Sequence, residues 1–340
     1  MSLSVPRLVL SVLSMSISVC AIAQGIATSK ALPWPAELPA TLPAQSVQYV
    51  VPKSNYVLDF HGSPQKPDLV IFMAGNQYRA FPELVQAFRL WVKQQPRWAD
   101  VPAENIFYAT TPPGRLIDAM ASGKLSLGNL WFDVTPATLW PDVFMTGVRQ
   151  QQRLHQMGQV DEYYSYVQNR GVVLLVRTGN PKNIHGVTDL ARNDVRVAIS
   201  ALKREPASYE NYAAAIDGQG GKGLTQRIMA KPNTISPEVV HHRENPQFIA
   251  DGLADVAPMF WHFGDYLKRS FPDQFDYVLL PKEGNNFASM AVAMIKSSPR
   301  PRAAQAWTEF IQSDVAADVY TRNGFDYASQ PERTKAVRIN

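Results

Sequence analysis

Short apolar runs alternate with helix-spaced patterns along the chain from Val47 onward. Residues 68–73 form an apolar run of strand length after the first residue, a pattern typical of a buried parallel strand. The next apolar positions recur three and four residues apart and predict a helix that ends before Pro96: Phe81, Leu84, Val85, Phe88, Trp91 and Val92. Because strands that alternate with helices form parallel sheets with helical crossovers, this pattern predicts an α/β fold.

The same alternation continues to the C-terminal end. Strand-like runs cover residues 105–109, 142–147, 171–177, 195–200, 238–242, 277–280 and 290–294, and another strand begins at 254–256. Helical spacing covers residues 116–120, 187–191, 209–215, 246–252, 303–311 and 315–320. Two stretches interrupt the pattern: residues 149–161 are polar and glutamine-rich, and the glycine-rich residues 218–223 predict a surface loop.

The N-terminal end has the pattern of an export signal. Arg7 supplies one positive charge, residues 8–23 are mostly apolar, and Ala21-Ile22-Ala23 matches the small-x-small sequence that signal peptidase accepts. A membrane-spanning helix needs about 20 strongly apolar residues, and this run is shorter and contains several serines. We therefore expect residues 1–23 to be a cleavable signal peptide, with a retained anchor as the alternative.

Cys20 is the only cysteine, so a chain cleaved after residue 23 would contain none. Lipidation at Cys20 is not expected, because Val19 is larger than the residue that lipidation signals place before the cysteine. A chain without thiols has no disulfide and no cysteine-ligated metal site, which suits an oxidising compartment. We expect a soluble periplasmic protein in which the proline-spaced residues 24–45 form an extended linker.

Charge and motifs disfavour several classes of function. The net charge of +4 is spread over 340 residues without a basic stripe, so nucleic acid is not an expected partner. The chain has no Gly-x-Ser-x-Gly, no His-Glu-x-x-His and no phosphate loop, and the glycines of 218–223 do not follow a strand. We therefore do not expect an enzyme and expect no cofactor.

Several of these segments together carry a resemblance. Ala74-Gly75-Asn76-Gln77, Thr110-Thr111-Pro112-Pro113-Gly114 and residues 142–147 follow the first strands. Residues 174–198 are the most specific part, with Arg-Thr-Gly-Asn-Pro ending a strand, then Asp-Leu and Arg-Val-Ala. With Gly252-Leu-Ala-Asp255 further on, the chain resembles the type II periplasmic binding proteins of ABC importers, close to the molybdate-binding branch. The resemblance covers roughly residues 65–328.

The resemblance implies two doubly wound α/β lobes joined by two crossing strands, with a small anion in the cleft between them. Lobe 1 would contain residues 46–165 and 258–340, and lobe 2 residues 166–257. The implied partners are the permease subunits of an importer, and a monomer is expected. A sensor that reports lobe closure to a membrane receptor is the alternative.

The expected ligand contacts lie mostly at turns that follow strands, where helix N-termini present free N–H groups: Gly75, Asn76, Gln77, Thr110, Thr111, Ser200, Arg243, Trp261 and His262. Each hydroxyl could instead cap a helix, and Trp261 could simply pack. The molybdate-binding branch has a serine where this chain has Gly75-Asn76. An oxyanion such as molybdate or tungstate and a small organic anion therefore both remain candidates.

Residues 241–244, His-His-Arg-Glu, form the densest polar cluster. On a strand, alternate side chains point to opposite faces, so His241 and Arg243 would share one face and His242 the other. His242 or the Arg243 guanidinium could then reach an anion. A metal site is a further hypothesis, but it needs three or four converging ligands, and the other histidines are scattered. In the simplest interpretation, Arg243 and Glu244 pair at a helix start.

Overall fold

The computed structural model describes residues 60–127, 130–238 and 240–339. The predicted signal peptide, Cys20 and the predicted linker lie outside these residues. Among the helices that are described, none combines the length and the apolar character needed to cross a bilayer.

The first sheet has the strand order β1-β3-β2-β6-β13-β7-β14, and β15 pairs with β7. Neighbours β3, β2 and β6 run parallel, whereas β13 is antiparallel to both β6 and β7. The strands are β1 (Phe60–His61), β2 (Leu69–Met73), β3 (Ile106–Ala109), β6 (Val143–Gly147), β7 (Glu162–Gln168), β13 (Ser289–Met294), β14 (Asp326–Tyr327) and β15 (Val337–Arg338). The strands expected near residues 68–73, 105–109, 142–147 and 290–294 are confirmed.

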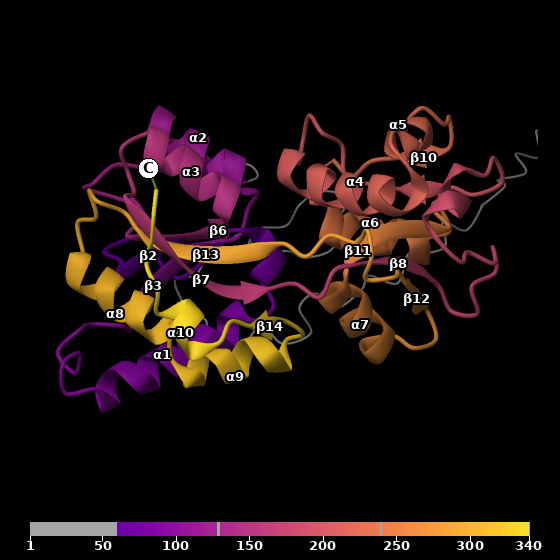
Figure 1. Cartoon of the computed structure of the whole chain (residues 1–340). Helices are drawn as coiled ribbons and strands as arrows, with labels where there is room; N and C mark the ends of the chain where they lie inside the picture. The colour runs from indigo at the N-terminus through magenta and orange to yellow at the C-terminus, as the bar shows by residue number, and fades with distance from the viewer. Residues whose placement is uncertain (1–59, 128–129, 239, 340) are drawn as a thin grey trace, which may run out of the picture. The chain divides into compact units, whose positions relative to one another are not determined.

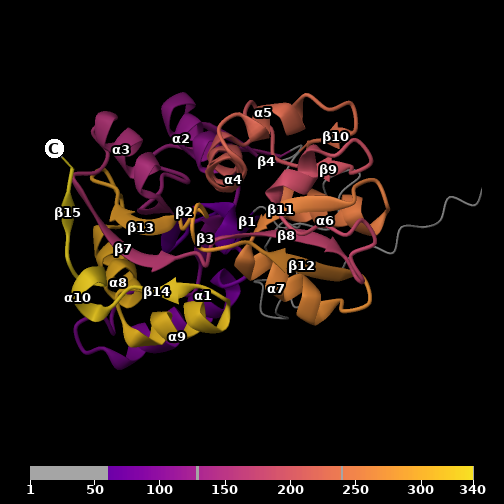
Figure 2. The same ribbon diagram turned by 45° about the vertical axis from the view of Figure 1, so that its right-hand side comes forward.

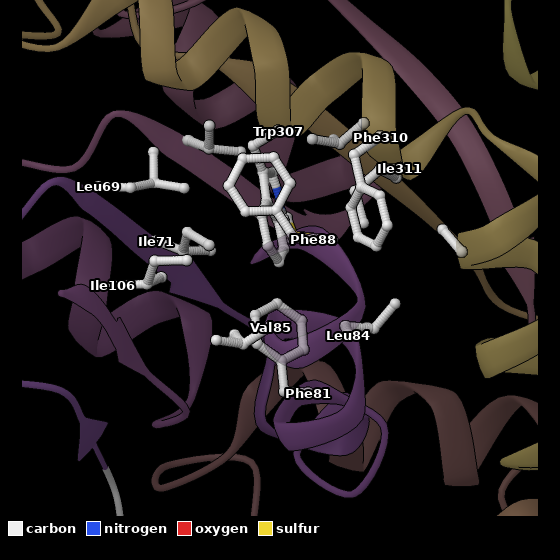
Figure 3. Close-up of a cluster of buried hydrophobic side chains, with 14 of the residues drawn as sticks. Leu69, Ile71, Phe81, Leu84, Val85, Phe88, Ile106, Trp307, Phe310 and Ile311 are labelled. Carbon is white, nitrogen blue, oxygen red and sulfur yellow. Dashed lines mark hydrogen bonds between the residues drawn. The ribbon is translucent and has the colours of Figure 1, made fainter. Parts of the chain in front are cut away.

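Both faces of this sheet are buried, as the apolar run in β2 predicts. Leu69 and Ile71 pack into a cluster with Phe88 and Trp307, whereas Val70 and Phe72 pack on the opposite face. Figure 3 shows the first of these clusters. The helices and the additional hairpin of this half are η1 (Gly75–Gln77), α1 (Phe81–Gln94), α2 (Pro113–Ser122), β4 (Lys124–Leu127), β5 (Leu130–Asp133), α3 (Val148–Gln156), α8 (Pro301–Ile311), α9 (Asp314–Arg322) and α10 (Gln330–Arg333).

The second sheet has the order β10-β9-β11-β8-β12 and its own apolar core. Its strands are β8 (Val172–Arg177), β9 (Val197–Ala198), β10 (Thr234–Ile235), β11 (Val256–Phe260) and β12 (Phe275–Leu279). Its helices are η2 (Val187–Ala191), α4 (Pro206–Gly220), α5 (Leu224–Met229), α6 (His241–Ala250) and α7 (Trp261–Ser270). Helices α4 and α5 lie on one side of the sheet and α7 on the other (Figures 1 and 2).

The expected two-part α/β fold is confirmed, but one predicted boundary is wrong. Pro258 lies in the middle of β11, which pairs with β8 along its whole length, and β12 pairs with the other edge of β8. The chain therefore returns to the first sheet at β13, not at residue 258. Apolar periodicity cannot assign a strand to a sheet, because assignment depends on pairing between distant segments.

Two connections join the sheets, one between β7 and β8 and one between β12 and β13. The Asn285 side chain ties them together: its Oδ1 accepts from the Val172 N–H at 2.9 Å, and its Nδ2 donates to the Val172 carbonyl at 3.1 Å. The Asn169 N–H also donates to the Ala288 carbonyl at 3.0 Å. These bonds hold the two crossing segments against each other, as the two-strand connection requires.

Three local predictions are wrong. Residues 149–161 contain α3, because glutamine and arginine are good helix formers and the Leu154 side chain supplies a buried contact. Gly218 belongs to α4 and not to a loop, and a Cβ added to it would lie 2.4 Å from the Gly284 carbonyl oxygen. His241 and His242 begin α6 and are not on a strand, so the argument from alternating faces does not apply to them.

Candidate ligand-binding cavity

A cavity of about 570 Å³ is lined by residues from both halves of the fold. The first-sheet half contributes the η1 turn, the start of α2, the end of β6 with the start of α3, and the first residues of β13. The second-sheet half contributes the segment that enters α4 and the first residues of α6. This volume lies in the range of small-molecule sites in proteins, roughly 300–1,000 Å³.

Four of the described helices, α2, α3, α4 and α6, begin at the wall of this cavity, and their first residues line it: Pro113, Val148, Pro206 and His241. None of the four is capped by a hydrogen bond from its N-cap side chain, but the first N–H of α6 donates to the Glu205 carboxylate, so the free N-termini are those of α2, α3 and α4. The N-terminus of a helix carries a partial positive charge from its aligned peptide dipoles and uncapped N–H groups. The backbone therefore makes the electrostatic potential of the cavity favourable to an anion.

Several charged side chains at the cavity wall neutralise one another. Arg149 of α3 forms an ion pair with Glu210 of α4, which links the two halves across the cavity. Arg153 Nη2 lies 2.7 Å from Asp118 Oδ1 within the first-sheet half. Neither pair leaves a full charge for a ligand.

Arg115 and Lys203 are different, because neither side chain forms an ion pair or a hydrogen bond with a described residue. Arg115 lies in the first turn of α2, and Lys203 lies in the segment between β9 and α4. Both side chains are exposed at the cavity wall, one from each half. Two cations that approach from opposite sides add to the positive potential of the helix N-termini.

The η1 turn allows the backbone to approach closely. A Cβ on Gly75 would lie 2.4 Å from the Thr110 carbonyl oxygen and 3.2 Å from Cε1 of His242, so only glycine fits without a shift of the backbone. The Asn76 carbonyl accepts a hydrogen bond from His262 Nε2 at 3.0 Å. The Asn76 Oδ1 atom is buried and has no hydrogen-bond partner among the described residues.

His241 holds the start of α6 in place. Its backbone N–H and its Nδ1 are each 2.9 Å from the carboxylate of Glu205, and its Nε2 is 2.6 Å from the Tyr212 hydroxyl. Burial raises the pKa of Tyr212 well above its ordinary value, which keeps this phenol protonated. These contacts occupy both nitrogens of the His241 ring.

The neighbouring His242 is 2% exposed and also lines the cavity. Its ring stacks on Tyr78 at 5.1 Å and on Phe263 at 5.0 Å, and these two rings also contact each other at 5.8 Å. Neither ring nitrogen of His242 has a hydrogen-bond partner among the described residues. Burial, together with the nearby His241, Arg243 and His262, holds the pKa of His242 well below its ordinary value. This imidazole is therefore neutral at neutral pH.

Residues 69–326 match the family model of bacterial extracellular solute-binding proteins. The chain belongs to this family. A stretch is 30% identical over 159 residues to the thiosulfate-binding protein of Escherichia coli (strain K12), covering 43% of this chain and 46% of that protein. The match thus spans about half the length of this curated relative.

Solved structures show the fold. The periplasmic molybdate-binding protein of Azotobacter vinelandii superposes with a TM-score of 0.54 at 14% identity, covering 77% of this chain and all of that one (100%). The sulfate-binding protein SubI of Mycobacterium tuberculosis gives a TM-score of 0.52 at 18% identity, covering 76% of this chain and 85% of that one. This solute-binding protein therefore has the type II periplasmic binding protein fold, as its sequence resemblance implies.

The structure brings some of the predicted contacts of this solute-binding protein to the cavity. Gly75 and Asn76 line it, and Thr110 and Thr111 are buried directly before the lining residues 112–114. Ser200 is buried three residues before the lining residue Lys203, and its Oγ has no hydrogen-bond partner among the described residues.

Of the predicted contacts, only Gly75 and Asn76 belong to the lining, and the remaining ones lie outside it. Gln77 is fully buried behind the turn, where its Oε1 accepts from the hydroxyls of Tyr166 at 2.5 Å and Tyr320 at 2.7 Å. Arg243 lies over the Tyr78 ring at 5.4 Å, and Arg170 lies 4.9 Å over the Trp261 ring. His262 does not line the cavity itself, but its Nε2 donates a hydrogen bond to the backbone carbonyl of the lining residue Asn76.

Sequence reasoning missed Arg115, Thr146 and Lys203, all of which line the cavity. The sequence pattern could have identified Thr146 and Lys203, because both lie at the end of a predicted strand or shortly after it. Thr146-Gly147 ends an apolar run just before α3, and Lys203 follows the strand of residues 195–200 closely. Because the sequence after Gly147 is polar, α3 was not predicted there. The turn at Gly147 was therefore not recognised as a strand-to-helix turn like those after Gly75 and Thr110.

The described residues contain no group of three or more His, Cys, Asp or Glu side chains placed to hold a metal ion. Within the 241–244 cluster, both ring nitrogens of His241 already contact Glu205 and Tyr212.

Proposed function

We propose that this solute-binding protein captures a small anion in the cavity and delivers it to the permease subunits of an ABC importer. The observation that carries the proposal is the convergence of three helix N-termini, those of α2, α3 and α4, on one cavity. A ligand of this charge is supported by the proteins to which the chain is similar, a thiosulfate-binding protein in sequence and sulfate- and molybdate-binding proteins in fold.

The size of the cavity bears on which anion binds. A water molecule occupies about 30 Å³ in the liquid, so a cavity of about 570 Å³ has room for on the order of twenty waters. A tetrahedral oxyanion would fill a small part of this space unless the two halves approach further. A small organic anion with its charge near Arg115 and Lys203 would fill more of it.

Capture, and not catalysis, is the role that the polar groups support. Glu205, His241 and Tyr212 form a hydrogen-bonded series that resembles a catalytic relay. However, Tyr212 is fully buried, its hydroxyl is bonded to His241, and it is absent from the cavity lining. Since a nucleophile must reach its substrate, we assign this series to holding the start of α6.

A thermal-shift screen of the purified protein tests the proposal. Sulfate, thiosulfate, molybdate, phosphate and small carboxylates would each be added, because a ligand of the folded state stabilises it by RT ln(1 + [L]/Kd), about 2.7 kcal/mol at a hundredfold excess over Kd. We expect one anion class to raise the melting temperature. No shift with any anion would contradict anion capture.

Charge variants then place the bound anion. Arg115→Ala combined with Lys203→Ala should weaken binding of the anion found in the screen at least about tenfold, because both unpaired cations are lost. Lys222→Ala combined with Arg338→Ala removes the same two charges from exposed positions outside the cavity lining and should leave affinity unchanged. Equal affinities for the two double variants would show that the anion binds elsewhere.

A further inference from the structure

His242 brings an unusual group to a site for anions. Anion sites built from helix N-termini, arginine and lysine present only donors, whereas a neutral imidazole has one N–H donor and one acceptor nitrogen. His242 is 2% exposed, and neither nitrogen is bonded to a described residue. Leaving a buried acceptor unpaired costs free energy, so a ligand that satisfies it is favoured over one that does not.

The position of the ring places both nitrogens beside the cavity turn. Cε1 lies between Nδ1 and Nε2 in an imidazole, and Cε1 of His242 is the atom that faces Gly75, 3.2 Å from the position of a Cβ on that residue. Gly75 itself lines the cavity. Tyr78 and Phe263 also contact each other, with ring centroids 5.8 Å apart, so the three rings form one cluster in which both nitrogens of His242 are buried without a hydrogen-bond partner among the described residues.

We propose that His242 makes the cavity selective for anions that also carry a hydrogen-bond donor, such as a hydroxy acid or a monohydrogen oxyanion, over anions that carry only acceptors. This inference rests on the proposed capture of an anion and specifies the class of anion. The hydroxyl or acid proton of the ligand donates to the acceptor nitrogen of His242.

Two other polar atoms of the wall fit the same ligand class. Asn76 Oδ1 and Thr146 Oγ1 are buried at the cavity and have no hydrogen-bond partner among the described residues. The amide of Asn76 and the hydroxyl of Thr146 can each accept as well as donate. A ligand that presents only acceptors would satisfy the donors of this wall and leave its acceptors unpaired.

Matched ligand pairs test the inference on the unaltered protein. Malate and succinate differ by one hydroxyl, as do lactate and propionate, and at pH 7.5 phosphate is largely monohydrogen phosphate whereas sulfate has no proton. Calorimetric titration should give the donor-bearing member of the bound pair an affinity at least about tenfold higher. Equal affinities, or a preference for the donor-free member, would overturn the inference while leaving anion capture intact.

A variant then assigns the preference to His242. His242→Phe keeps an aromatic ring in contact with Tyr78 and Phe263 but removes both nitrogens, so the two members of each pair should bind with equal affinity. His61→Phe is the matched control, because His61 is also a buried, ring-stacked histidine, 4.4 Å from Tyr108, and is outside the cavity lining. A preference that survives in His242→Phe would overturn the assignment. If only donor-free anions such as thiosulfate or molybdate bind the unaltered protein, the inference is overturned and anion capture stands; if no anion binds, it is the proposed function that fails.

Discussion

The Nε2 atom of His262 donates a hydrogen bond to the backbone carbonyl of Asn76 at 3.0 Å. His262 lies in α7, next to the second sheet, and Asn76 lies in the η1 turn after β2 of the first sheet. The two residues are 186 positions apart in sequence, and both are buried. The bond holds a cavity-lining turn of one half against a helix of the other half.

Replacing His262 should therefore affect both stability and binding. His262→Phe leaves the buried Asn76 carbonyl without its donor, which we expect to lower the free energy of unfolding by about 1–3 kcal/mol. Ligand affinity should fall as well, because the η1 turn loses its support. Urea denaturation and calorimetric titration measure the two effects. His262→Gln, whose amide can donate, should recover part of both, and no recovery would show that ring packing matters more than the bond.

Acid should destabilise the protein through its buried histidines. Burial, with a contribution from Arg243, lowers the pKa of His61 to about 3, and burial, with Arg79 and His241, lowers the pKa of His262 to about 3. An unfolded histidine has a pKa of about 6.5 and so binds a proton that the folded state rejects. The stabilisation is complete above about pH 6.5 and is lost as the pH falls towards 3.

The expected loss between pH 7.5 and pH 4.5 is on the order of a few kcal/mol, measured by urea denaturation at each pH. His61→Phe removes one of these groups and retains the ring stack with Tyr108, so its stability should depend less steeply on pH. An unchanged slope in this variant would show that carboxylates, and not His61, dominate the acid response.

Gly75→Ala should disrupt the cavity. The added methyl group would lie 2.4 Å from the Thr110 carbonyl, so the backbone must shift, at a cost of about 1–3 kcal/mol in the free energy of unfolding. The shift moves both the η1 turn and the contact with His242, and ligand binding should weaken by at least about tenfold. Gly186→Ala is the control, because nothing lies within 4 Å of a Cβ there and its φ of −171° suits any residue. Equal stability and equal ligand affinity of Gly75→Ala and Gly186→Ala would contradict the close approach of Gly75 to the Thr110 carbonyl.

Asp142 supports the first sheet and gives a prediction for stability alone. Its carboxylate accepts from the Val70 N–H at 2.7 Å, the Ser298 hydroxyl at 2.6 Å and Arg300 Nε at 2.7 Å. Asp142→Ala leaves these donors without their acceptor and should lower the free energy of unfolding by about 3–5 kcal/mol. Glu104→Ala, which breaks the exposed pair with Lys93, should cost less than about 1 kcal/mol. Similar midpoints of urea denaturation for the two variants would contradict this ranking.

Elements defined by local periodicity were predictable from the sequence. Helix α1 follows from the spacing of Phe81, Leu84 and Phe88, and β2 follows from an apolar run whose alternate residues are buried on both faces of a sheet. Helix α3 was not predictable in this way. It buries few residues, Gln151 and Leu154, so its apolar signal is too weak to separate it from a polar loop.

The sequence by itself determined the α/β fold, the family and the Gly75-Asn76 turn at the cavity, because these depend on local spacing and on motifs that are contiguous in the chain. Only the tertiary structure decided that β11 and β12 belong to the second sheet, that His242 begins a helix beside Gly75, and that Arg115 and Lys203 approach one cavity from opposite halves. The physical reason is that strand pairing and the convergence of helix N-termini join residues far apart in the chain, and no local pattern of hydrophobicity records those contacts.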